Sequence, residues 1–121
     1  MGLAVANKGA TVTGTAGAAA TLTITALAGE RIAITSLQIQ RATNVAEATG
    51  TTIAITTTNL PGTPSWLVGR ALVAGNTVTD VNMVFDPPLV SSTAGTDVTI
   101  VCPDPGTTPQ WNLNAFYFST A

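Results

Sequence analysis

Short runs in which apolar and polar residues alternate recur along most of this chain, and glycine or proline usually separates one run from the next. In residues 21–27, Leu22 and Ile24 fall on one side of an extended backbone while threonines fall on the other. Threonine is the most abundant residue, and with valine and isoleucine it favours strands because β-branched side chains restrict χ1. Because helical periodicity is almost absent, the pattern predicts an all-β fold.

The spacing of the runs predicts about eight strands. We expect them at residues 21–27, 31–41, 51–58, 66–73, 77–85, 89–91, 97–102 and 111–119. The apolar positions change parity within the second run, which predicts a β-bulge or bend near Thr35 and Ser36. Proline cannot donate to a ladder, so residues 86–88 are expected to end the fifth run. In the last run one face carries Trp111, Leu113, Ala115 and Tyr117, and the other carries Asn112, Asn114, Phe116 and Phe118.

Strands of this number and length suit two antiparallel sheets packed face to face. The expected fold is therefore an all-β, eight-stranded antiparallel jelly-roll sandwich with an extended N-terminal arm. An immunoglobulin-like sandwich is the alternative, but the Cys…Trp…Cys spacing of antibody domains is missing.

Residues 1–19 differ from the rest because they are mostly alanine, glycine and threonine, with few large apolar side chains. Such a segment buries little area, so we divide the chain into an arm at 1–19 and a jelly-roll domain at 20–121. Two interpretations of the arm are open. It is either a disordered terminus or a segment that lies on a neighbouring subunit, where small side chains allow close approach.

Charged residues make up only 8% of the chain, whereas a soluble domain usually carries about 25%. Nucleic-acid binding needs a cluster of Lys and Arg, so no nucleic-acid partner is expected. The four basic residues are scattered instead: Lys8, Arg31, Arg41 and Arg70. We expect Arg31 and Arg41, at the two ends of one run, to be solvated. The apolar runs are far shorter than the ~20 residues of a spanning helix and the N-terminus lacks a signal-peptide pattern, so no membrane association is expected.

The residue types that perform catalysis are nearly missing. Without His, the chain has no Ser–His or Cys–His nucleophile system and no His-bearing metal site. Cys102 lies in a β-type run and is interpreted as a small buried apolar residue. Two carboxylates could still form a Ca²⁺ site or a hydrolytic pair, and the candidates are Glu30, Glu47, Asp80, Asp86, Asp97 and Asp104. Since several of these flank turns, we expect no catalytic, cofactor or metal site and no enzyme activity.

Two tryptophans and the larger apolar residues of the arm are the candidate contact residues. Trp66 and Trp111 each begin a predicted strand, and a core, a subunit-contact or a sugar-stacking role is open to them. The possible subunit or partner contacts are Leu3, Val5, Val12, Trp66 and Trp111.

A set of segments occurs in a characteristic order: residues 28–37, 51–55, 72–76, the Phe-Asp-Pro-Pro of 85–88, 92–97, and the aromatic residues 116–118. This order resembles small single-jelly-roll virion proteins of tailed bacteriophages, especially head decoration (cement) proteins. The resemblance covers roughly residues 20–119 and contains no catalytic motif, so no functional residue is carried over. It implies a homo-oligomer, expected to be a trimer, that binds the major capsid protein on the outer surface of the virion and stabilises the head.

The alternative function is a receptor- or carbohydrate-binding jelly-roll module of a phage tail fibre or tail tip. That function would require Trp66 or Trp111 to be exposed beside polar groups.

Overall fold

The computed structural model describes residues 7–47 and 51–121, and all regular secondary structure in these ranges is β-strand. The strands are β1 (Lys8–Thr13), β2 (Ala20–Ile24), β3 (Arg31–Ala42), β4 (Thr52–Thr58), β5 (Trp66–Gly69), β6 (Thr77–Val90), β7 (Val98–Cys102) and β8 (Gln110–Thr120). Within the described ranges, no helix is long and apolar enough to cross a membrane.

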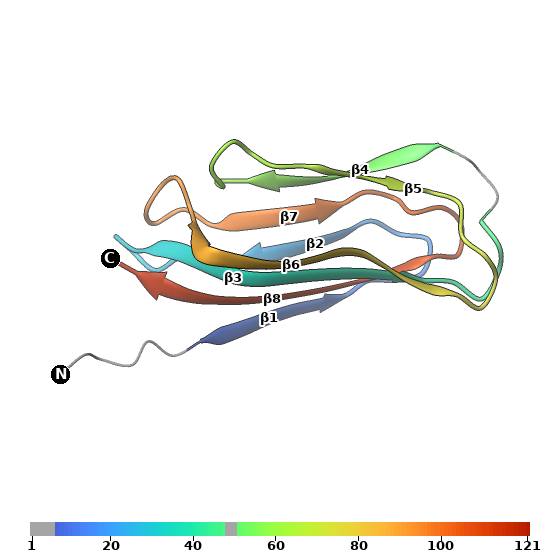
Figure 1. Ribbon diagram of the computed structural model, residues 1–121, viewed down its shortest axis with the longest axis horizontal. Helices are drawn as coiled ribbons and strands as arrows, with labels where there is room; N and C mark the ends of the chain where they lie inside the picture. The colour runs from blue at the N-terminus through green and yellow to red at the C-terminus, as the bar shows by residue number, and fades with distance from the viewer. Residues whose placement is uncertain (1–6, 48–50) are drawn as a thin grey trace.

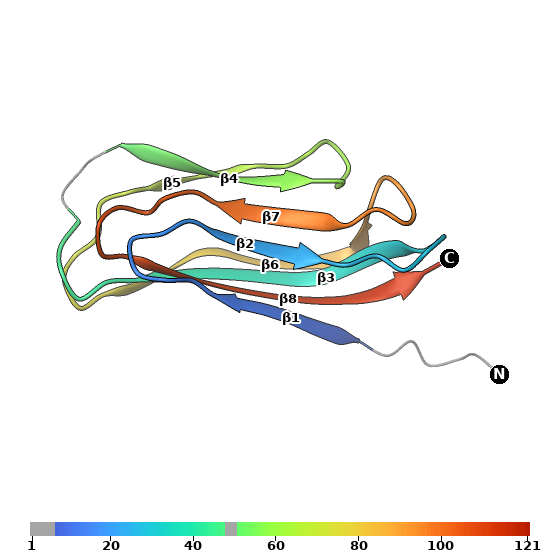
Figure 2. The ribbon, with the colours of Figure 1, turned by 180° about the vertical axis from the view of Figure 1, so that it is seen from behind.

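The strands form two antiparallel four-stranded sheets, in the orders β1-β8-β3-β6 and β2-β7-β4-β5. Figure 1, and Figure 2 from behind, show the sheet β2-β7-β4-β5 above the sheet β1-β8-β3-β6, with β1 beside β8. The chain passes from one sheet to the other after every strand except β4, which is followed by its neighbour β5. The two interlocked sheets give the predicted eight-stranded jelly-roll sandwich.

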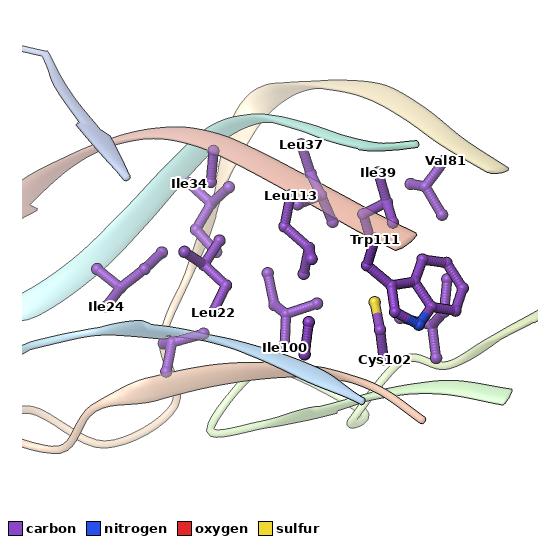
Figure 3. Close-up of a cluster of buried hydrophobic side chains, with 14 of the residues drawn as sticks. Leu22, Ile24, Ile34, Leu37, Ile39, Val81, Ile100, Cys102, Trp111 and Leu113 are labelled. Carbon is purple, nitrogen blue, oxygen red and sulfur yellow. The ribbon is translucent and has the colours of Figure 1, made fainter. Parts of the chain in front are cut away.

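The core fills the space between the two sheets. Figure 3 shows side chains of both layers, among them Ile34 and Leu113 from one sheet and Leu22 and Ile100 from the other, directed toward each other. All four are almost completely buried. Along β2, β7 and β8 the buried residues alternate with more exposed ones, because successive side chains of a strand point to opposite faces of the sheet. The alternation in the sequence therefore predicted which face of these strands is buried.

The predicted irregularity in the second run is confirmed. The register of β3 shifts between Ile34 and Ser36 against both of its neighbours, β6 and β8. Such a bulge changes which side chains face the core, so Ile34 and Leu37 are both buried although they are three residues apart.

The N-terminal segment differs from the prediction. Residues 8–13 form β1, which pairs along its full length with β8, from Lys8 opposite Tyr117 to Thr13 opposite Asn112. These residues are an edge strand of the chain's own sheet and not an arm separate from it. Val12 packs against the core, and the weak apolar content of the strand fits its edge position. Residues 1–6 lie outside the described residues.

The fifth run does not end at the prolines. β6 continues through Pro87 and Pro88 to Val90, and it includes the predicted short strand 89–91 almost entirely. It pairs only with β3, so it is an edge strand, where a missing N–H donor need not break a ladder. Val84 of β6 pairs with Ser36 of β3, and the next paired residue of β6 is Leu89, opposite Ile34. The prolines lie in the irregular stretch between them.

Candidate interaction surfaces

The charged residues of the described chain lie mostly at the two ends of the sandwich. The exceptions are the buried pair Arg41 and Asp80, and Asp86 in the irregular stretch of β6. The other charged residues lie in loops or next to strand ends: Lys8, Glu30, Arg31, Glu47, Arg70, Asp97 and Asp104. As a result, the regular strand stretches on the solvent side of each sheet carry uncharged residues.

The solvent side of the sheet β1-β8-β3-β6 is covered by amide and hydroxyl side chains. The strand register places them in two cross-strand rows, Thr11–Asn114–Gln38–Asn82 and Thr13–Asn112–Gln40–Thr79. A third row beside the first consists of Gly9, Phe116, Ser36 and Val84. We call these three rows the amide face.

Two hydrogen bonds orient the asparagines of the amide face. The Thr11 hydroxyl donates to Oδ1 of Asn114 at 2.6 Å, and the Thr13 hydroxyl donates to Oδ1 of Asn112 at 3.1 Å. Since each amide oxygen accepts from β1, each Nδ2 amino group remains to donate elsewhere. A depression of about 170 Å³ lies at one end of this face, lined by Thr13, Gln40, Ala42, Thr77, Gln110, Trp111 and Asn112.

The solvent side of the other sheet is dominated by threonine. Its cross-strand rows are Thr23–Thr99–Thr58, Thr21–Val101–Thr56 and Ala54–Leu67. We call these rows the threonine face. The hydroxyls of Thr58 and Thr99 lie 2.6 Å apart and bond to each other, and the Leu67 side chain is 73% exposed. This face therefore offers threonine methyl and hydroxyl groups, two of the hydroxyls bonded to each other, and one large unburied apolar side chain.

Three of the five candidate contact residues, Val12, Trp66 and Trp111, lie within the described residues. Trp111 is completely buried, and its indole Nε1 donates to the carbonyl oxygen of Pro103 at 2.8 Å. Trp66 and Val12 are partly buried and pack against the core. Trp111 is thus a core residue, and its buried indole is not available to a partner. Leu3 and Val5 lie outside the described residues.

The large exposed apolar residues are instead Phe116 and Val84 on the amide face, at 55% and 80% exposure on either side of Ser36, and Leu67 on the threonine face, at 73%. Sequence reasoning did not select them as contacts. Alternation did place Phe116 on the side of its strand opposite Trp111, so a signal for its exposure was present.

Arg41 is buried, contrary to the expectation of a solvated strand end. Its Nε lies 2.9 Å from Oδ2 of Asp80, and Nη2 donates to the carbonyl oxygen of Gly69 at 2.7 Å. Its guanidinium carbon lies 5.2 Å from the centre of the Trp111 ring, within the range of a cation–π contact. Arg31, at the other end of β3, is exposed as expected.

Cys102 is buried in the core, as the sequence predicted, and lies beside Trp111 in Figure 3. Burial, with a further contribution from the Asp80 carboxylate, raises the pKa of its thiol from 9.0 to about 12. A nucleophilic cysteine requires a thiolate near neutral pH, so this environment favours an inert thiol.

The six carboxylates are dispersed. Asp80 is paired with Arg41, while Asp97 accepts from the backbone N–H of Ala26 at 2.9 Å and Asp104 from that of Gly106 at 2.9 Å. Glu47 accepts from the N–H of Thr107 at 3.2 Å. Within residues 7–47 and 51–121, no group of three or more His, Cys, Asp or Glu side chains could hold a metal ion.

Comparison with protein-family models, with curated proteins and with solved structures gave no match to this chain.

Proposed function

We propose that this protein is a structural subunit of a phage virion, a capsid decoration protein that binds the major capsid protein on the outer surface of the head as a homo-oligomer. A trimer is the form we propose. The observation that carries the proposal is the threonine face, an uncharged sheet surface with one highly exposed leucine.

The threonine face can be buried against a second copy at a lower desolvation penalty than a charged surface. No charged side chain has to leave water, and the hydroxyls of Thr58 and Thr99 already bond to each other. Burying the exposed part of Leu67 contributes up to about 1.5–3 kcal/mol for each copy. Neutral rows of this kind suit permanent contacts between subunits, which are more apolar than transient ones.

The jelly-roll fold is consistent with this function but does not select it, since the same fold supports many activities. The sparse charge and the inert environment of the one cysteine agree with a role in assembly. The charged loop ends of the sandwich, outside the proposed contact between copies, remain available for the capsid.

The oligomeric part of the proposal can be tested with two matched variants. Leu67 and Val73 are similarly exposed, at 73% and 71%, but only Leu67 belongs to the threonine face. We expect Leu67→Lys to weaken self-association at least tenfold, because it replaces a buried apolar contact by a charge. Val73→Lys should leave the oligomer unchanged.

Light scattering coupled to size-exclusion chromatography measures the outcome. The parent chain and Val73→Lys should show a mass close to a trimer of the 12.2 kDa chain, and Leu67→Lys should shift toward the monomer. A monomeric parent chain would contradict the proposed oligomer. Equal behaviour of both variants would contradict the assignment of the threonine face.

A further inference from the structure

We infer that the amide face is a binding site for an uncharged polysaccharide. This goes beyond the assembly role proposed above and uses the opposite side of the sandwich, so each proposal can fail without the other.

The charge pattern of the amide face selects the chemistry of the ligand. Across its three rows the side chains are threonine, serine, asparagine and glutamine, with Phe116 and Val84 as the large apolar members. No Lys, Arg, Asp or Glu lies in these rows, so neither an anionic polymer nor a basic peptide would find a counter-charge. A neutral sugar chain carries hydroxyl groups that both donate and accept, and it needs no counter-charge.

The hydrogen-bonding groups of the face are pre-arranged. Because the hydroxyls of β1 bond to Oδ1 of Asn112 and Asn114, the amino groups of both side chains are left as donors. Gln38 lies next to Asn114 in its row, and its side chain makes no hydrogen bond to another described residue. The face therefore presents fixed donors beside an amide that can donate and accept, a combination that suits the hydroxyl groups of sugars.

Phe116 provides an apolar platform at the edge of these rows. It lies opposite Gly9 of β1, where a Cβ atom would lie 3.6 Å from Cε1 of the ring. The ring thus lies over a glycine that has no side chain to compete for the space. Its remaining surface is 55% exposed, which leaves room for a sugar ring to pack on it.

The size of the face suits a chain and not a single sugar. Phe116, Asn114 and Asn112 are alternate residues of β8, so the rows follow one another at about 6.8 Å. The depression of about 170 Å³ is lined in part by Thr13, Asn112 and Gln40 of the last row, and it is far larger than the roughly 10–15 Å³ that one water needs. An extended polymer could contact Phe116 at one end and enter the depression at the other.

Native gel electrophoresis of the full chain tests the inference, with a soluble polysaccharide cast into the gel. The neutral probes are hydroxyethylcellulose, glycogen, yeast mannan and galactomannan, and the anionic comparison is alginate. We expect at least one neutral polymer to retard the protein and alginate to retard it less. Phe116→Ala and Gln38→Ala should each weaken that retardation about tenfold, as expected for the loss of one well-placed contact.

Two further variants serve as controls. Phe116→Tyr keeps the ring and should bind like the parent chain, and Thr23→Ala, on the threonine face, should leave retardation unchanged. Thermal melting of each variant verifies that it is folded. The inference is overturned if no neutral polymer retards the protein, if alginate retards it equally, or if Phe116→Ala and Gln38→Ala both bind like the parent chain.

Discussion

Arg41 and Asp80 form a buried ion pair with two contacts, from Nε to Oδ2 at 2.9 Å and from Nη2 to Oδ1 at 3.1 Å. The two residues lie on neighbouring strands of one sheet, β3 and β6. The same guanidinium donates to the carbonyl oxygen of Gly69, at the end of β5 in the other sheet. This arginine is therefore a polar link between the two layers, in a core that is otherwise mostly apolar.

Removing either partner of this pair should strongly destabilise the fold. Arg41→Met leaves the Asp80 carboxylate buried without its counter-charge, and we expect the free energy of unfolding to fall by about 3–5 kcal/mol. The double variant Arg41→Met/Asp80→Leu removes both charges and should recover part of that loss. Urea denaturation of the parent, both single variants and the double variant gives the coupling between the two residues.

The exposed Arg31, at the start of the same strand, is the control for this cycle. Arg31→Met should change stability by less than about 0.5 kcal/mol, as usual for a surface substitution. Equal effects of Arg31→Met and Arg41→Met would contradict the buried ion pair.

The buried thiol of Cys102 should make stability depend on pH in the alkaline range. The folded-state pKa is raised to about 12 from an ordinary value of 9.0, so the folded state keeps this proton after the unfolded state has lost it. The resulting stabilisation is complete below pH 9 and is lost as pH rises toward 12. The slope is at most about 1.4 kcal/mol per pH unit.

Comparison with Cys102→Ala isolates this effect from other groups that titrate at high pH. The difference in unfolding free energy between the parent and the variant should shrink steadily from pH 9 to pH 12. A difference that stays constant over this range would show that the thiol is not buried as described.

Two glycines with nearly the same backbone conformation should respond differently to alanine. Gly17 and Gly75 have φ values of 74° and 73°, but only at Gly17 would a Cβ atom collide with backbone, at the carbonyl oxygen of Thr107. At Gly75 no atom lies within 4 Å of that position. Gly75→Ala should cost about 1–2 kcal/mol through backbone strain alone, and Gly17→Ala clearly more. Thermal melting of the two variants tests this, and equal losses would contradict the close packing at Gly17.

The two indoles should be distinguishable by fluorescence. In Trp66→Phe the remaining indole is that of Trp111, which is fully buried and bonded to Pro103. Its emission should be blue-shifted and protected from iodide until the protein unfolds. In Trp111→Phe the partly buried Trp66 remains and should be quenched more readily. Strong quenching of Trp111 in the folded protein would contradict its core position.

Local alternation in the sequence predicted much of the fold, because burial of one strand face is encoded within a few residues. The bulge near Ser36 and the buried side of the strand that contains Leu113 both follow from parity alone. Local alternation does not indicate which strands pair, since the pairing of β1 with β8 joins residues about one hundred positions apart.

The errors have a common physical origin in contacts that are distant in sequence. β1 was assigned to an arm because its own side chains bury little, whereas its place in the sheet comes from pairing with β8. Arg41 was expected in solvent because nothing near it in sequence indicates Asp80, its partner 39 residues later. The prolines of β6 were expected to end the strand, because the local sequence does not show that this strand lies at the edge of its sheet, where proline is tolerated.

The measurement that tests the central claim most directly is the copy number of this protein in particles produced from the genome that encodes it. Quantitative mass spectrometry of purified particles gives its ratio to the major capsid protein, and gentle dissociation shows whether it leaves intact heads as an oligomer. A decoration protein predicts many copies in a fixed ratio to the capsid protein, released as a homo-oligomer from the outer surface. Its absence from the particles, or its presence in only a few copies that remain with the tail, would contradict the proposed function.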